Sequence, residues 1–119
     1  MPTISAVNIA VDQSRPYHRV CPKLPGSVNG IKMKGLIDTG SEINLVSSLF
    51  LEEANVPMYN LPEGMRNWTM RTATNDLEAF LGFARIELVV GKVELRIDAL
   101  VVESASSNLI LGGPFLVNY

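Results

Sequence analysis

The stretch from Gly35 to Val46 reads GLIDTGSEINLV, and it places one acidic residue directly after an apolar run and directly before Thr-Gly. Leu36 and Ile37 precede Asp38, and the apolar pattern resumes at Leu45. This pattern predicts that Asp38 ends a largely buried strand. Burial of a carboxylate costs free energy unless the group is paired or hydrogen-bonded. The stretch therefore indicates either a turn, for which Asp-Thr-Gly is well suited, or a carboxylate that is kept for its chemistry.

The length and composition of the chain fit one domain that spans residues 1–119. A chain of 119 residues can bury roughly two thirds of the surface that its unfolded form exposes. Ten basic and twelve acidic residues give a net charge of -2, and no Lys/Arg cluster is dense enough to follow a phosphate backbone, which argues against a nucleic-acid partner. No apolar stretch reaches the length of a membrane span or forms a signal core. We therefore expect a soluble, cytoplasmic protein without a membrane partner.

Cys21 and His18 are the only cysteine and the only histidine. One cysteine excludes an internal disulfide, and these two residues are too few for a zinc site, so we expect neither a metal nor a cofactor. Their spacing in an extended segment puts them on opposite faces, which disfavours a Cys–His pair. A nucleophilic serine such as Ser41 would need a neighbouring histidine base, and His18 lies in a proline-rich connector.

The first half of the chain is predicted to contain strands and one short helix. The segment 1–26 is typical of an N-terminal strand followed by a proline-rich connector. Residues 27–38 have the pattern of a β-hairpin with its turn at Asn29–Gly30. Apolar residues at helical spacing within 44–58 predict a short helix, for which Ser47 is a candidate N-cap.

The second half of the chain has a period of two, which is typical of strands. Residues 68–73 and 78–90 are predicted to form one long hairpin with a polar tip. A two-residue turn at Gly91–Lys92 would lead into a further strand at 93–102. A last apolar strand begins at Leu109. The class expected from this pattern is all-β with one short helix, arranged as a small closed or sandwiched sheet.

The order of three features adds to this prediction. Leu36-Ile37-Asp38-Thr39-Gly40-Ser41 comes first, a polar-tipped hairpin follows, and Leu109-Ile110-Leu111-Gly112 lies near the C-terminus. This order resembles the retropepsin-like aspartic proteases encoded by retroviruses and LTR retrotransposons, and the similarity covers roughly residues 27–116. The resemblance implies a small closed β-barrel or sandwich with one short helix and a flap hairpin, working as a homodimer.

The resemblance also implies roles for individual residues. Asp38 would be the catalytic aspartate, and Thr39, Gly40 and Ser41 would form the active-site loop. The residues implied in substrate binding are Glu42, the flap-tip residues Thr74, Asn75 and Asp76, and Ile110, which would line an apolar subsite. Two of these roles have open alternatives, because a polar hairpin tip can be a solvated turn and Ile110 can be a core residue.

A single Asp-Thr-Gly occurs in the chain, whereas hydrolysis by this family needs two carboxylates that flank one water. The second carboxylate would come from another copy, and the two like charges would then share one proton. The implied function is a homodimeric endopeptidase that cleaves an extended polypeptide and processes a retroelement polyprotein. The alternative is a retropepsin-fold domain that dimerises or binds peptides without turnover.

Three features depart from the family's pattern. Ser41 stands where retroviral members often have alanine, Gly113 stands where a basic residue is common, and the hairpin tip lacks glycine. The chain also leaves little room for a C-terminal interface strand. Either the N-terminal segment 3–10 supplies interface strands, or the sequence is a trimmed piece of a polyprotein.

Overall fold

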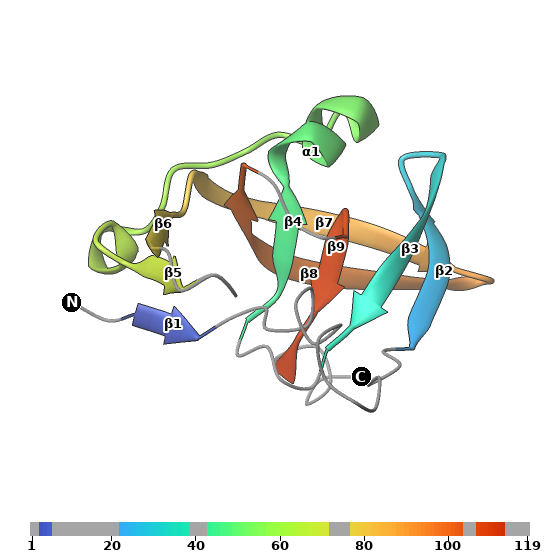
Figure 1. Cartoon of the computed structure of the whole chain (residues 1–119). Coiled ribbons are helices and arrows are strands. Elements are labelled where there is room, and N and C mark those ends of the chain that lie inside the picture. Colours follow the sequence, from blue (N-terminus) through green and yellow to red (C-terminus); the bar gives the residue numbers. More distant parts are fainter. Residues whose placement is uncertain (1–2, 6–21, 39–42, 72–76, 104–106, 114–119) are drawn as a thin grey trace, which may run out of the picture.

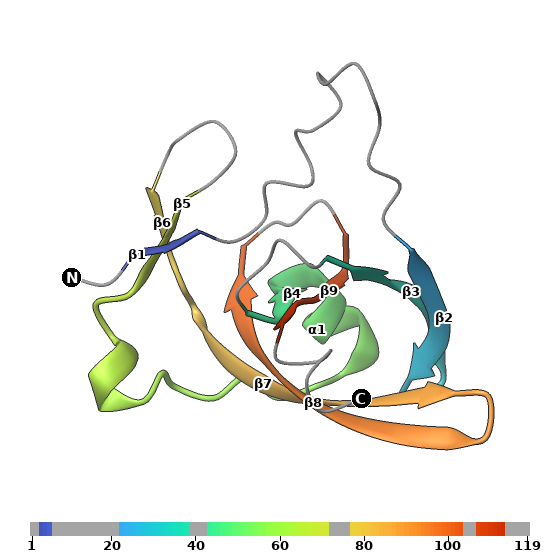
Figure 2. The ribbon, with the colours of Figure 1, turned by 90° about the horizontal axis from the view of Figure 1, so that it is seen from below.

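The computed structural model describes residues 3–5, 22–38, 43–71, 77–103 and 107–113, and the side chains of 22–38, 43–70, 77–103 and 107–113. Within these ranges the chain forms a closed β-barrel with a small three-stranded sheet beside it (Figures 1 and 2). The strand order around the barrel is β2-β3-β9-β4-β8-β7. The barrel strands are β2 (Lys23–Val28), β3 (Ile31–Ile37), β4 (Leu45–Ser47), β7 (Gly82–Val90), β8 (Val93–Val102) and β9 (Leu109–Leu111). The prediction of an all-β fold with one short helix is confirmed, and of the closed or sandwiched sheet that it allowed the closed barrel is observed.

The hairpin of β2 and β3 turns at Asn29 and Gly30, as predicted. Both residues have positive φ angles, 50° and 83°, which is the backbone of the two-residue turn that Asn-Gly favours. β2 begins at Lys23, so residues 23–26, which we assigned to the connector, belong to the sheet. The prolines suggested a connector, but a strand can contain proline where it has a neighbour on one side only. β2 pairs with β7 only at Ser27 and Val28. Pro25 therefore lies where a missing N–H breaks no second ladder of hydrogen bonds.

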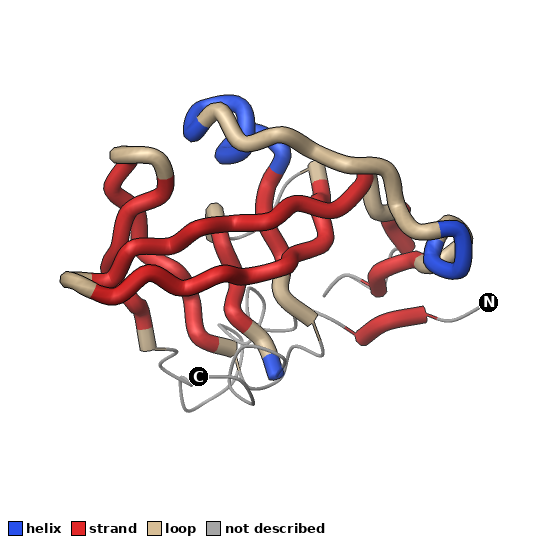
Figure 3. Tube along the Cα trace, turned by 180° about the vertical axis from the view of Figure 1, so that it is seen from behind, coloured by secondary structure: helices blue, strands red, loops and turns tan. Residues whose placement is uncertain are grey.

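The β7–β8 hairpin forms the long wall of the barrel (Figure 3). It turns at Gly91, which has a φ of 62°. Ala84, Ile86 and Leu88 face inward and are fully buried, while the side chains between them are exposed or half-buried. The predicted period of two and the predicted turn are both confirmed.

The hairpin predicted from residues 68 to 90 is present at 69–71 and 77–79, but the prediction that its second arm runs to Val90 as one strand is wrong. β5 (Thr69–Arg71) and β6 (Leu77–Ala79) pair with each other in the smaller sheet, whereas β7 belongs to the barrel. The strand breaks after β6 because the N–H of Leu81 donates to the carbonyl of Val101 at 2.9 Å and directs the chain into the barrel. Gly82 follows, and a Cβ at this position would clash with the carbonyl oxygen of Tyr59.

The smaller sheet has the order β1-β5-β6. β1 (Thr3–Ser5) runs parallel to β5 and is paired from Thr3 opposite Thr69 to Ser5 opposite Arg71. The predicted N-terminal strand is thus present at residues 3–5, and the rest of the segment 3–10 lies outside the described residues. Where it is described, this segment pairs within its own chain.

The helix α1 (Ser48–Ala54) follows β4 directly, as predicted. The side-chain oxygen of Ser47 accepts a hydrogen bond from the N–H of Phe50 at 3.2 Å, so Ser47 is the N-cap. Asn55 ends the helix in the left-handed conformation. A short 3-10 turn at Glu63–Met65, which the sequence pattern did not predict, precedes β5. No helix in the described ranges is long and apolar enough to cross a membrane.

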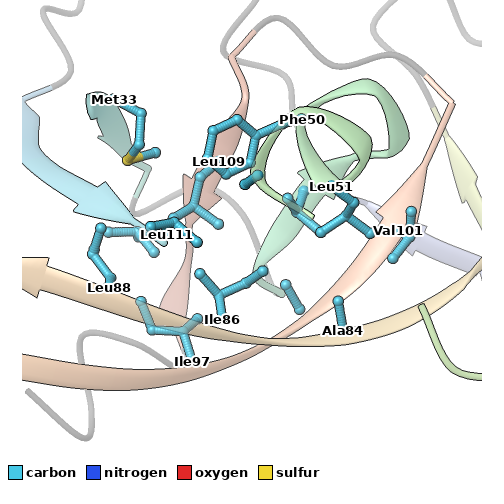
Figure 4. Packing of buried hydrophobic residues seen from close by; sticks show 14 residues of the cluster. Met33, Phe50, Leu51, Ala84, Ile86, Leu88, Ile97, Val101, Leu109 and Leu111 are labelled. Atoms are coloured by element: carbon cyan, nitrogen blue, oxygen red, sulfur yellow. The ribbon is translucent and has the colours of Figure 1, made fainter. Parts of the chain in front are cut away.

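Two apolar clusters hold these elements together. The larger one fills the barrel and takes in the buried side of α1 (Figure 4). The smaller one joins the β5–β6 hairpin to the barrel. Its buried members are Leu45, Met70, Phe80, Leu100, Val102 and Ile110. The smaller sheet is therefore packed against β4, β8 and β9, and β9 pairs with β3.

Candidate active site

Asp38 is the first residue after β3 and has no exposed surface. Its backbone N–H donates to the carbonyl of Leu111 at 2.9 Å, and the N–H of the preceding Ile37 donates to the carbonyl of Pro22 at 2.8 Å. The backbone that presents Asp38 is thus fixed from both sides. Asp38 follows the strand directly, as predicted, but the strand itself is not largely buried, because only Met33 and Gly35 of β3 are buried.

The parallel pair β3 and β9 brings the two sequence motifs together. Leu36 lies opposite Ile110, and Ile37 lies opposite Leu111. Because parallel strands end at the same edge of a sheet, Asp38 and Gly112 leave that edge side by side. The first motif and the last motif of the sequence therefore form one structural unit around the carboxylate.

Asp38 is the only buried acidic side chain among the described residues. Asp98, by comparison, has a side chain that is 73% exposed and lies 3.7 Å from the guanidinium of Arg85. An ionised carboxylate in the interior costs free energy that a neutral residue of the same shape does not. The position of Asp38 is therefore explained better by its chemistry than by the stability of the fold.

Asn44 connects the edge of β9 to β8. Its side-chain oxygen accepts a hydrogen bond from the N–H of Gly112 at 2.9 Å, and its side-chain nitrogen donates to the carbonyl of Asp98 at 3.1 Å. Its own carbonyl accepts from the N–H of Leu100 at 3.0 Å. Asn44 thus positions the residue that leaves the sheet beside Asp38. We did not predict this role, although one polar residue between Ile43 and Leu45 in an apolar run was a usable signal.

Replacing Asn44 by alanine is expected to lower the free energy of unfolding by about 2–3 kcal/mol, because it leaves the buried N–H of Gly112 and the carbonyl of Asp98 without their partner. Urea unfolding measures this change, and amide hydrogen exchange at Gly112 should become faster. Asn60→Ala is the matched control at an exposed asparagine and should change stability by less than about 0.5 kcal/mol. Equal stability of the two variants would contradict the assigned role of Asn44.

Most of the other predicted site residues lie outside the described residues. This applies to the loop residues Thr39, Gly40, Ser41 and Glu42 and to the hairpin-tip residues Thr74, Asn75 and Asp76. The hairpin that carries this tip is present as β5 and β6. The roles of these residues stay predictions.

Ile110 is described, and it has no exposed surface. It belongs to the smaller apolar cluster, together with Leu45 and Met70. In this structure the side chain is therefore placed as a core residue, which was the alternative left open by the sequence. Its role in a substrate subsite stays a prediction.

The described residues contain no group of three or more His, Cys, Asp or Glu side chains that could hold a metal ion. A buried carboxylate at the end of a rigid strand can accept a proton, donate one when protonated, and orient a water molecule.

Comparison with known proteins agrees with this arrangement. Residues 24–118 match the family described as "gag-polyprotein putative aspartyl protease". The chain belongs to this family of aspartyl proteases. No curated protein matches the sequence of the chain.

The structure of this aspartyl protease family member is similar to several solved structures with retropepsin-like folds. The retroviral protease-like domain of Ddi1 from Leishmania major is 16% identical, with a TM-score of 0.65 over 84% of this chain and 78% of that chain. A retropepsin-like aspartic protease from Rickettsia conorii is 19% identical, with a TM-score of 0.60 over 83% and 79% of the two chains. The EIAV protease complexed with the inhibitor HBY-793 is 13% identical, with a TM-score of 0.59 over 84% and 88%. At these identities the likeness shows a shared retropepsin-like fold.

Proposed function

We propose that this protein is an aspartic endopeptidase whose active site forms from the Asp38 residues of two identical chains. The observation that carries the proposal is the burial of Asp38 at the end of β3, beside Gly112. The family assignment supports it. We propose a polyprotein as the substrate, since the description of the matching family names the gag polyprotein.

Two chains are needed because one chain supplies one suitable acid. No second buried carboxylate accompanies Asp38 in the described ranges, and Asp-Thr-Gly occurs once in the sequence. A two-fold axis next to Asp38 would place the same residue of a second copy opposite it. The burial that is costly for one carboxylate would then favour a pair that carries one proton and one negative charge.

The pair can hydrolyse a peptide bond without a covalent enzyme intermediate. The ionised Asp38 removes a proton from a bound water, and the water oxygen forms a bond to the carbonyl carbon. The protonated Asp38 of the second copy donates its hydrogen bond to the carbonyl oxygen as negative charge develops there. The carbon–nitrogen bond then breaks, and the leaving amine takes a proton from the pair. The products are one carboxylic acid and one amine, and one water is consumed.

This mechanism predicts a bell-shaped dependence of kcat/KM on pH, with its maximum at acidic to mildly acidic pH. Activity falls at low pH because both carboxylates are protonated and no base is left. It falls at high pH because both are ionised and no acid is left. Cleavage of a mixture of unfolded peptides, followed by mass spectrometry across pH, measures the profile. Activity that rises steadily through neutral pH would contradict an Asp38 pair. Peptides that are recovered uncut at every pH would contradict the endopeptidase and favour the alternative, a domain that dimerises or binds peptides without turnover.

A further inference from the structure

The outer face of the β2–β3 hairpin carries three lysines. Lys32 and Lys34 of β3 lie opposite Ser27 and Pro25 of β2, and Lys23 belongs to the same alternation along β2. Residues directly opposite each other in an antiparallel pair point to the same face of the sheet. All three lysines are exposed, whereas the β3 residues on either side of Lys34 are buried. Lys23, Lys32 and Lys34 therefore form one basic patch on the outside of the barrel, the lysine face.

The lysine face is not neutralised by acidic neighbours. Residues 22–37 contain three lysines and no aspartate or glutamate, so this segment has a charge of +3 and the rest of the chain a charge of -5. Among the described residues, none of the three lysines takes part in an ion pair. Glu94 shares the face, but β2 and β7 separate it from Lys32, which is about 14 Å at the spacing of neighbouring strands. Dissolved salt screens most of the attraction between exposed charges at that distance.

A groove of about 580 Å³ lies on this face, where β2 and β3 meet the end of β7. The cations that line it are Lys32 and Lys34, and no acidic residue lines it. Its apolar lining includes Pro25, Met33 and Val89. A ligand that complements this lining has negative charge beside an apolar group.

An acidic segment of a polypeptide fits these properties better than a nucleic acid does. Carboxylate side chains can pair with the two lysines, while a neighbouring apolar side chain contacts the groove. Lys32 and Lys34 are two residues apart on one strand, about 7 Å, which is also the spacing of alternate residues in an extended peptide. A nucleic acid would need a longer run of cations to follow its phosphates, and the groove has no aromatic lining residue on which a base could stack.

The lysine face is separate from the candidate active site. Lys34 precedes Asp38 by four residues, so the two residues are about 13 Å apart along an extended strand. The β2–β3 hairpin lies at the opposite end of the molecule from β5 and β6 (Figures 1 and 2). A segment bound at the lysine face is thus distinct from the residues that would lie next to the carboxylate.

We propose that the lysine face and its groove form a docking site for an acidic segment of a polypeptide that also carries apolar side chains. The assignment of this segment to the substrate rests on the proposed endopeptidase function. Binding outside the active site tethers the substrate and raises its effective concentration near Asp38, and the positive charge speeds the encounter with an acidic chain. Polypeptides with such a segment are then cleaved in preference to those without it.

Binding is tested in the full chain with Asp38→Asn, so that the probe is not cleaved. The probe is the fluorescein-labelled peptide Glu-Glu-Val-Glu-Glu-Val, the neutral control is Gln-Gln-Val-Gln-Gln-Val, and fluorescence anisotropy measures the affinity. Lys32→Gln with Lys34→Gln removes two charges from the lysine face, and Lys32→Arg with Lys34→Arg keeps them. Arg66→Gln with Arg85→Gln removes two charges from exposed positions elsewhere.

We expect the acidic peptide to bind and the neutral peptide not to bind. The two glutamine substitutions in the lysine face should lower the affinity for the acidic peptide by about three- to tenfold, since each exposed ion pair is weak. The two arginine substitutions at these positions, and the substitutions at Arg66 and Arg85, should keep the affinity. Equal binding of the two peptides, or an equal loss in the variant at Arg66 and Arg85, would overturn the inference.

Two further outcomes would assign the lysine face to another partner and would also overturn the inference. One is tighter binding of a single-stranded oligothymidylate than of the acidic peptide, which would indicate a nucleic acid. The other is a change in solution mass caused by Lys32→Gln with Lys34→Gln, which would indicate contact between copies of the chain.

Cleavage by the chain with Asp38 intact tests the role in substrate selection. A peptide substrate that is extended by the acidic stretch should have a higher kcat/KM than the same substrate without it. Lys32→Gln with Lys34→Gln should abolish this advantage and leave the kcat/KM of the plain substrate unchanged. An advantage that survives these substitutions would contradict the role. If the acidic peptide binds as expected but no peptide is cleaved, the docking site stands and the endopeptidase proposal fails.

Discussion

Asp38→Asn is expected to lower kcat/KM for peptide cleavage by about a thousandfold or more, because asparagine can neither remove a proton from water nor donate a carboxyl proton. The side chain keeps its shape, so the fold and the dimer should be retained. We expect the free energy of unfolding to stay within about 1 kcal/mol of the unchanged protein, or to rise, because a buried carboxylate is replaced by a neutral amide. Cleavage assays, urea unfolding and solution mass measure the three quantities.

The matched control for this variant is Asp98→Asn, which makes the same chemical change at an exposed position. Asp98 faces Arg85 at the surface, where an ion pair contributes less than about 1 kcal/mol. Its substitution should leave kcat/KM unchanged. Cleavage that survives Asp38→Asn in a protein free of contaminating protease would show that another group performs the reaction.

Local sequence signals predicted the elements around the site. The turn at Asn29–Gly30, the cap at Ser47 and the place of the buried Asp38 directly after β3 each depend on a few neighbouring residues. Such signals have direct physical causes, namely positive φ angles, a side chain that satisfies a helix N–H, and an uninterrupted apolar run. These features were therefore readable from the sequence.

Pairing between distant strands could not be read in the same way. The period of two is shared by β6 and β7, so it does not show that the chain leaves one sheet for another between them. The parallel pairings of β1 with β5 and of β3 with β9 join segments far apart in the sequence. They depend on how the whole barrel closes, and no local pattern fixes them.

The same limit applies to two site residues. Asn44 was overlooked because its partners, Asp98 and Gly112, are more than fifty residues away in the chain. Ile110 has the same apolar character whether it lines a pocket or fills the core, and only its packing against Leu45 and Met70 shows where it lies in this structure.

Mixing the active chain with Asp38→Asn is expected to suppress activity beyond simple dilution. If each active site needs two intact Asp38 residues, a mixed dimer has lost one of them and cannot hold the shared proton correctly. An equal mixture that has exchanged subunits should then keep about one quarter of the activity, the fraction of dimers with two intact chains. Independent subunits would keep about one half. An Asp98→Asn chain added in the same way should cause no loss.

The dependence of activity on the fraction of intact chains tests the shared site most directly. The total protein concentration is held constant and well above the dimer dissociation constant, and the mixtures are incubated until subunit exchange is complete. If two chains share one site, the cleavage rate will follow the square of the intact fraction. A rate that falls in direct proportion to that fraction would show that each chain works with its own Asp38, and would contradict the two-chain active site.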